Sequence, residues 1–309
     1  MNGQLILIPK RSETNLGKRE RQDPHKLTMN SAKAFCPASL SLIFKVCPNP
    51  NPYKMGSQGV GFTVDKGVKV VVKKSENTTV LFNNKRINLP TIEYLINSLT
   101  KQKLLIQINS PLPIGCGFGI SGASALSCGL AVNKLLRLGK SKTFLTKLAH
   151  LAEIKNRTGL GSVGTQTTGG FLLKETPGIP FRFKSYPFIG QKVYVIILGK
   201  IETPTILQNS RLRGEINSAA DLVLNKIKQM KKIAFKDFLD LSLEFAERSY
   251  LLTDEKMLSL IERMKANNFH VSMAMLGRVL ITDRSPSSVV KNYPVVKLAI
   301  SSQTAGLLD

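Results

Sequence analysis

The chain contains 309 residues with a mass of 34.0 kDa, a length that fits one large domain or two of ordinary size. Hydrophobic residues make up 42% and charged residues 21%, so a core can form and a wholly disordered chain is excluded. No stretch approaches 18 consecutive apolar residues, and the early apolar run Leu5–Ile8 ends at Pro9. We therefore expect a cytoplasmic protein with no membrane partner.

The charge balance is strongly basic, with 44 Lys and Arg against 20 Asp and Glu, a net charge of +24 and a pI near 10.0. Such a field favours anionic partners, from metabolites to polyanions. The excess is spread along the chain, so a solvated lysine-rich surface without a partner stays an open alternative. The four cysteines form no CxxC pair and lie far from the three histidines, which argues for reduced thiols and against a zinc site.

Residues 1–28 are polar and mixed in charge, and they predict a flexible tail upstream of Met29, a candidate start. The next part favours strands, with a helix over Thr91–Leu99 because apolar residues recur at helical spacing. Asn83-Asn84 predicts a hairpin turn. The predicted strands are Ser31–Phe35, Ser39–Val46, Gly59–Val64, Lys66–Lys74, Thr79–Asn83, Lys85–Leu89 and Leu104–Ile108.

The middle of the chain predicts two helices, one ending near Leu138 and one starting after a Ser141 cap and broken by Gly159 and Gly161. A stretch rich in Pro and Gly near 177–187 divides the predicted domains, 29–185 and 186–309. Strands are predicted over Phe171–Leu173, Val193–Leu198 and His270–Thr282, and residues 214–266 are predicted to be mostly helical.

The most informative stretch is glycine-rich and runs from Ser110 to Ala125, between a predicted strand and a predicted helix. Glycine permits positive φ, and a helix N-terminus adds unpaired N–H groups, so together they suit phosphate. The spacing Gly115-x-Gly117-x-Gly119-x-x-Gly122 matches neither a P-loop nor a dinucleotide fingerprint. A tight turn with close helix packing would explain the same glycines.

The following helix carries His150, Glu153 and Arg157 at positions i, i+3 and i+7, which predicts one shared polar face. A carboxylate such as Glu153 and a hydroxyl such as Ser121 would suit Mg²⁺, which takes one or two protein oxygens beside phosphate and water. An exposed Glu153–Arg157 ion pair is the simpler alternative.

Three ordered segments resemble the signatures of the GHMP kinases: Phe35–Ser39, Pro113–Ala125 and Ser272–Gly277. Within that superfamily the resemblance is to archaeal pantoate kinases. It rests on four further segments: Lys54–Gly59, Gly117–Gly122, Ala149–Glu153 and Asn156–Gly161. It covers roughly residues 31–285.

The resemblance implies an α+β fold with two domains, a ribosomal-protein-like N-terminal domain and a split β-α-β C-terminal domain. It implies transfer of the ATP γ-phosphoryl group to pantoate for coenzyme A synthesis, with Mg²⁺ held by Ser121 and Glu153. Arg157, Lys54 and His150 are the candidates for the pantoate carboxylate, with Arg157 also counted as catalytic and preferred because its guanidinium is forked. The predicted ATP-binding residues are Pro113, Gly115, Gly117, Phe118, Gly119, Ser121, Gly122, Ala123 and Ser124. A homodimer is expected because dimers are common in this superfamily.

Two positions depart from the family pattern. Ser162 stands where many relatives carry an acidic residue, and Gln58 stands where arginine is expected. These departures keep open a related kinase acting on another hydroxy acid or alcohol. The net charge keeps open a nucleic-acid-binding protein on the same fold. The absence of Trp and the low aromatic content, 6%, argue against that last alternative.

Overall fold

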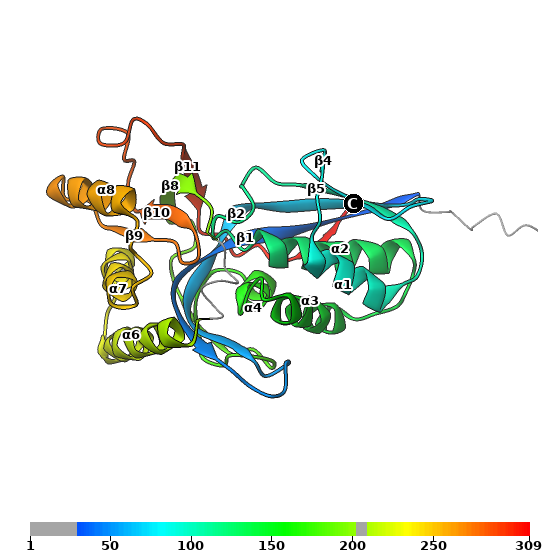
Figure 1. The fold of residues 1–309 in the computed structure, drawn as a ribbon, viewed down its shortest axis with the longest axis horizontal. Helices are drawn as coiled ribbons and strands as arrows, with labels where there is room; N and C mark the ends of the chain where they lie inside the picture. The colour runs from blue at the N-terminus through cyan, green and yellow to red at the C-terminus, as the bar shows by residue number, and fades with distance from the viewer. Residues whose placement is uncertain (1–29, 202–208) are drawn as a thin grey trace, which may run out of the picture.

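The computed structural model describes residues 30–201 and 209–309, so the predicted tail over residues 1–28 lies outside the described residues. Within these ranges the strands form two sheets with helices packed beside them (Figure 1). The larger sheet has the order β12-β1-β2-β5-β3-β4, and β6 joins it by pairing with β2 and β7. Its strands are β1 (Ser31–Cys47), β2 (Gly56–Lys74), β3 (Thr79–Phe82), β4 (Lys85–Arg86), β5 (Leu104–Asn109), β6 (Phe171–Lys174), β7 (Phe183–Tyr186) and β12 (Gly306–Leu308).

Strands β1 and β2 are longer than the sequence pattern predicts, because each joins two predicted segments into one strand. Their antiparallel ladder continues through register shifts between Pro37 and Ser39 and between Ser41 and Ile43. Pro37 has no N–H to donate, so a bulge there lets the ladder resume beyond it. The predicted turn at Asn83-Asn84 is confirmed, since both residues have positive φ between β3 and β4.

One face of the larger sheet is covered by helices, with α2 lying closest to the strands (Figure 1). Almost every residue of α2 is buried, and its Ala, Gly and Ser positions let strands and neighbouring helices approach closely. The Ser141 cap is confirmed, because its side chain accepts a hydrogen bond from the Phe144 N–H. The helices here are α1 (Pro90–Leu99), α2 (Ile120–Leu135), α3 (Lys142–Asn156) and α4 (Ser162–Thr168).

The smaller sheet is antiparallel in the order β11-β8-β10-β9, and α7 contacts it through β9. The predicted single strand over His270–Thr282 is wrong: it is two strands joined by a turn in which Leu276 has a φ of 63°. The strands of this sheet are β8 (Lys192–Gly199), β9 (Val271–Met273), β10 (Arg278–Thr282) and β11 (Val295–Ala299). The accompanying helices are α6 (Ser210–Gln229), α7 (Phe235–Arg248) and α8 (Glu255–Ala266).

An aromatic cluster connects the two parts of the molecule. The rings of Phe171 in β6 and Phe238 in α7 lie 4.7 Å apart, and Tyr186 in β7 lies 4.9 Å from Phe238. Aromatic contacts at these separations stabilise beyond the area they bury. The chain leaves the larger sheet after β7 and enters the smaller one at β8, close to the predicted boundary at 185, but β12 returns to pair with β1.

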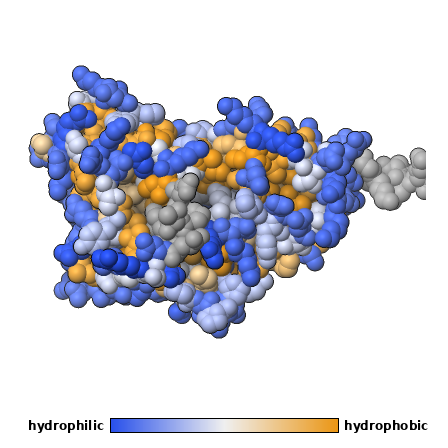
Figure 2. All heavy atoms as spheres, in the orientation of Figure 1, coloured by the Kyte–Doolittle hydropathy of each residue, from blue (hydrophilic) through white to orange (hydrophobic). Residues whose placement is uncertain are grey.

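The surface seen in the orientation of Figure 1 is largely hydrophilic, with hydrophobic residues gathered over the β2–β5 region and near the junction of the two parts (Figure 2). Across residues 30–201 and 209–309, no helix combines the length and apolar character needed to cross a membrane.

Candidate active site

A cavity of about 380 Å³ lies where the glycine-rich loop meets α1, β1, β2, β6, the C-terminal end of α3, and the turn between β9 and β10. Most of the residues in its wall have apolar side chains, have hydroxyl side chains or are glycines. Glu153 and Lys174 are the charged side chains among the described residues that line it. A site with one carboxylate and one ammonium suits a ligand that carries both a bound cation and a free anionic group.

The glycine-rich loop has the backbone that phosphate binding requires. Gly115, Gly117 and Gly119 line the cavity with φ values of 80°, 78° and 63°, a region that other residues rarely adopt. Gly119 is also the N-cap of α2 and supplies no side-chain hydrogen bond to the helix. The leading N–H groups of α2 therefore remain for an anionic ligand, and the helix dipole favours one there.

The third signature segment, Ser272–Gly277, packs against this loop and contributes Met275 and Leu276 to the cavity wall. A Cβ at Gly277 would clash with the carbonyl oxygen of Cys116, so only glycine lets the turn approach the loop backbone. Met275 and Leu276 consequently line the same cavity as Gly117.

Glu153 is a buried carboxylate held by hydroxyl groups, with 2% of its surface exposed. Ser162 Oγ donates to its Oε2 at 2.5 Å, and Thr158 Oγ1 donates to its Oε1 at 3.2 Å. Burial raises the pKa of Glu153, while hydrogen bonds from Ser162, Thr158 and Ser121 and the charge of Lys174 oppose that rise. The carboxylate is thus fixed in orientation before any ligand binds.

Ser121 and Glu153 together form an oxygen donor set that fits Mg²⁺. The Ser121 hydroxyl lies 2.9 Å from Thr91 Oγ1, and Ser121 and Glu153 line the same cavity, where the Ser121 hydroxyl opposes the rise that burial causes in the pKa of Glu153. No cluster of three or more His, Cys, Asp or Glu side chains able to hold a metal occurs in residues 30–201 and 209–309. Mg²⁺ commonly needs only one or two protein oxygens, completed by phosphate and water, so the pair is sufficient.

Lys174 is the residue that the sequence prediction missed. It ends β6 with 6% of its surface exposed, and its Nζ has no hydrogen-bond partner within the described part of the chain. Nζ lies 4.9 Å from the centroid of the Phe181 ring. Burial lowers the pKa of Lys174 to about 7. A cation buried without a partner costs stability unless a ligand pairs with it, so Lys174 indicates an anion-binding position.

The structure brings most of the predicted phosphate-loop residues to the cavity wall, but not all. Gly115, Gly117, Phe118, Gly119 and Ser121 line the cavity together with Glu153, whereas Pro113, Gly122, Ala123 and Ser124 do not. Gly122 packs behind the wall, where a Cβ would lie 2.8 Å from Glu153 Oε2. Its role is to leave room for the carboxylate.

The predicted shared face of His150, Glu153 and Arg157 is wrong for Arg157. Helix α3 ends at Asn156, and Arg157 is its C-cap with a φ of 55°, which turns its exposed side chain away from the helical register. The alternative of an exposed Glu153–Arg157 pair is also wrong, because Glu153 is buried. Arg157 and the exposed Lys54 do not line the cavity.

His150 is buried behind the cavity rather than on its wall. Its Nε2 is 3.0 Å from the carbonyl oxygen of Met55, and its ring packs edge-on against Phe181 at 5.4 Å. Burial and the charge of Lys174 lower the pKa of His150 to about 4, so the ring is neutral at physiological pH. His150 therefore supports the loop before β2 and the ring beneath Lys174.

Comparison with known proteins places this geometry in a family. The model for "GHMP kinases N terminal domain" matches residues 86–170, which include the glycine-rich loop and Glu153. A solved structure named "Phosphotransferase related to CoA biosynthesis pathway" superposes with a TM-score of 0.76 at 25% identity, covering 90% of this chain and 98% of that one. Mevalonate-3-kinase from Thermoplasma acidophilum shares the fold, with a TM-score of 0.65 at 14% identity over 91% of this chain and 99% of that one. The fold is that of a GHMP-type kinase.

Two archaeal relatives narrow the class. The pantoate kinase of Methanocaldococcus jannaschii is 33% identical over 85% of this chain and 98% of its own. The pantoate kinase of Methanospirillum hungatei is 30% identical over 89% of this chain and 96% of its own. The chain therefore belongs to the pantoate kinase family of the GHMP kinases.

Proposed function

We propose that this protein transfers the γ-phosphoryl group of ATP to the primary hydroxyl of pantoate, in the presence of Mg²⁺, and so serves coenzyme A biosynthesis. The observation that carries the proposal is the pairing of a phosphate-type loop with a buried ammonium, Lys174, in one cavity. Pantoate carries a carboxylate at one end and a primary hydroxyl at the other, so Lys174 would hold the carboxylate while the primary hydroxyl is directed toward the loop. Lys174 thus takes the role expected of Lys54, His150 or Arg157.

The phosphate-binding and metal-binding groups would act side by side in the cavity, because Ser121 follows Gly119 by two residues at the start of α2. Gly115, Gly117 and Gly119, with the N-terminus of α2, would bind the phosphates of ATP through main-chain N–H groups. Ser121 and Glu153 would hold Mg²⁺, which supplies neutralisation of the charge on the transferred phosphoryl group. The apolar part of the cavity wall would help to exclude water from the reacting groups once both substrates are bound.

The cavity offers no second carboxylate to take the proton from the pantoate hydroxyl, since Glu153 is the acidic side chain among its described lining residues. Phosphoryl transfer proceeds through a loose transition state that relies on positioning and electrostatics. We infer that the bond from phosphorus to the ADP oxygen breaks as the pantoate oxygen bonds to phosphorus, and that the alcohol proton leaves late, to an oxygen of the transferred phosphoryl group or to water.

An assay of ADP release with Mg²⁺-ATP tests the proposed function, with pantoate compared against a panel of other hydroxy acids, homoserine and mevalonate. We expect turnover to be highest with pantoate. Preference for another acceptor would favour a related kinase of different specificity. RNA binding that falls steeply with salt, together with no ADP release, would favour the nucleic-acid alternative raised by the net charge of +24. A cytoplasmic location stays a prediction. So does a homodimer, which light scattering would measure.

We expect Ser162 to hold Glu153 in place, and we do not expect the acidic residue that many relatives carry at this position to be needed as a base. We expect Ser162→Ala to lower kcat/KM about tenfold, because Glu153 Oε2 loses a donor at 2.5 Å. Ser162→Asp should lower activity as well, since it sets a second carboxylate against the first. Ser162→Thr, which keeps a hydroxyl, is the matched control in steady-state assays. A gain of about 10²-fold in Ser162→Asp, the size of general-base catalysis, would show that a base is missing.

A further inference from the structure

The Lys174 ammonium must lie at a fixed point to bind a substrate carboxylate, yet no hydrogen bond from the described part of the chain holds it there. Its Nζ makes no hydrogen bond within the described residues, so the ammonium is positioned through its own backbone and the packing of its side chain. That backbone lies at the last paired position of the ladder between β2 and β6, where Lys174 faces Gly59. Strand ends fray unless further bonds continue the ladder.

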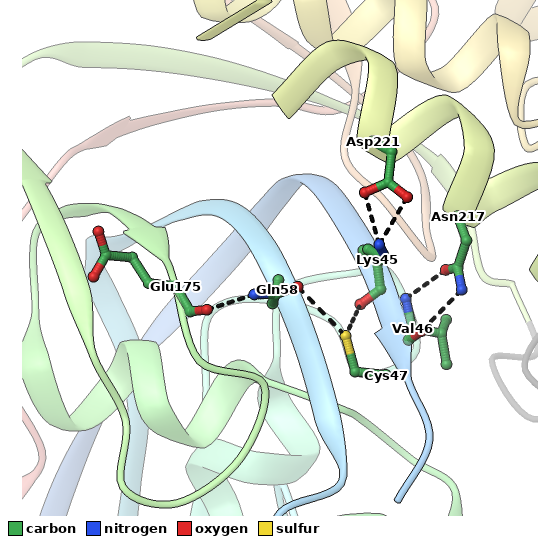
Figure 3. Close-up of polar contacts among 7 residues, drawn as sticks. All are labelled: Lys45, Val46, Cys47, Gln58, Glu175, Asn217 and Asp221. Carbon is green, nitrogen blue, oxygen red and sulfur yellow. Dashed lines mark hydrogen bonds and ion pairs between the residues drawn. The ribbon is translucent and has the colours of Figure 1, made fainter. Parts of the chain in front are cut away.

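Gln58 supplies the next bond in this ladder from its side chain (Figure 3). Its Nε2 donates to the carbonyl oxygen of Glu175 at 2.5 Å, one residue beyond the last ladder pair. On the other side, the N–H of Glu175 donates to the carbonyl oxygen of Arg182 at 2.9 Å. The peptide groups that follow Lys174 are therefore held on both edges, and Gln58 is the side-chain part of that restraint.

The other end of the Gln58 amide faces Cys47, whose single S–H is shared between Gln58 Oε1 and the carbonyl oxygen of Lys45, each 3.7 Å from Sγ (Figure 3). Cys47 is the last residue of β1, and the strand just before it is tied to α6 (Figure 3). Asn217 in α6 bonds both the N–H and the carbonyl oxygen of Val46, at 2.8 and 3.0 Å. Gln58 therefore connects the strand end carrying Lys174 to an anchored part of the molecule.

We propose that Gln58 is a positioning residue that keeps the Lys174 ammonium in place for the substrate carboxylate by holding the backbone at Glu175. The inference rests on the proposed function in so far as the anion is taken to be pantoate. The side chain of Glu175 points away from Gln58 (Figure 3), so its charge has no part in the restraint.

Gln58→Met tests the proposal because methionine fills a similar volume and makes neither hydrogen bond. We expect the KM for pantoate to rise about tenfold, mainly through loss of the hydrogen bond from Gln58 Nε2 to the Glu175 carbonyl, while kcat and the KM for ATP change less than about twofold. The matched control is Gln191→Met, since the Gln191 amide also donates to a backbone carbonyl, that of Lys192 at 2.9 Å, but outside the cavity. Its KM values should stay at the wild-type level.

A second measurement needs no substrate. The rate at which acetic anhydride modifies Lys174, followed by peptide mass spectrometry, should rise severalfold in Gln58→Met and stay unchanged in Gln191→Met. Cys47→Ala removes the S–H that Gln58 Oε1 shares with the carbonyl oxygen of Lys45 and leaves the bond to Glu175 in place, so it should shift both readouts in the same direction by a smaller factor. An unchanged pantoate KM and an unchanged modification rate in folded Gln58→Met would overturn the proposal.

Different results would contradict the proposed function and the proposed role of Gln58. Absence of pantoate turnover in the wild-type protein contradicts the proposed function but leaves the modification rates as a test of Gln58. Wild-type turnover of pantoate with equal losses toward ATP and pantoate in Gln58→Met, and no change at Lys174, contradicts the role of Gln58 alone.

Discussion

Replacing Lys174 with methionine should nearly abolish the use of pantoate while making the protein more stable. We expect the KM for pantoate to rise about 10²-fold or more, because a desolvated ammonium–carboxylate contact is lost. Stability should rise by roughly 2–4 kcal/mol at pH 7, since the unliganded protein then no longer buries an unpaired amine whose pKa is lowered to about 7. Thermal or denaturant unfolding measures the second effect. Lys184→Met, which removes an exposed lysine from β7, is the control for both.

As pH rises above 7, the stability of the wild-type protein and its affinity for pantoate should change in opposite directions. Burial lowers the pKa of Lys174 from 10.5 to about 7, so between these values the unfolded chain holds a proton that the folded protein has released. Stability therefore rises with pH across this window, and the advantage of Lys174→Met is greatest below pH 7 and vanishes above about 10.5. Pantoate affinity should fall as pH rises above 7, because the carboxylate needs the charged amine. A variant with unaltered pantoate KM, or with no gain in stability, would contradict this assignment.

The parts of the site that are local in sequence could be predicted from sequence. Gly115, Gly117 and Gly119 lie within five residues of one another, so a tight glycine-rich bend before a helix could be predicted from their spacing, and the family resemblance made it a phosphate loop, with Ser121 at the start of the helix. Glu153 was found through its place on an amphipathic helix and through the family resemblance. In each case the chemistry and the backbone conformation depend on neighbouring residues.

Lys174 could not be found in this way, because its position depends on contacts between distant segments. It reaches the cavity because β6 pairs with β2, and a single lysine after Phe171-Leu172-Leu173 is indistinguishable by pattern from an exposed strand end. The only signal in the sequence was a lysine at the end of a short apolar strand that begins directly after Gly169-Gly170. The predicted face of Arg157 was wrong for a local reason. Helical spacing would place it beside Glu153, but the helix ends at Asn156, one residue before it.

The fold shows the same division. The helix and hairpin signals were confirmed because caps and turns are local, as at Ser141 and Asn83-Asn84. The long strands were predicted in pieces, because a bulge that continues the β1–β2 ladder past Pro37 is visible only once both strands are paired. The turn at Leu276 and Gly277 was missed since its shape is set by the Cys116 backbone, which is distant in sequence.

Replacing Glu153 with glutamine should lower kcat/KM by on the order of 10³-fold with little change in structure. Glutamine keeps the size of the side chain and an oxygen that can accept from Ser162 or Thr158, so packing survives. It removes the charge that would hold Mg²⁺, whose contribution to the transition state is several kcal/mol. Titration calorimetry of ATP with and without Mg²⁺ should show that the metal no longer strengthens nucleotide binding.

The control is Glu175→Gln, which removes a neighbouring exposed carboxylate and should leave activity within about twofold of wild type. The charge of Glu153 also raises the pKa of Lys174, so its loss makes the amine easier to deprotonate. Glu153→Gln should therefore weaken pantoate binding as well, and more at pH 8 than at pH 6. Because the two charges are coupled, the free-energy losses of Glu153→Gln and Lys174→Met should not add in the double variant. Strict additivity would mean that the carboxylate and the amine act at separate sites.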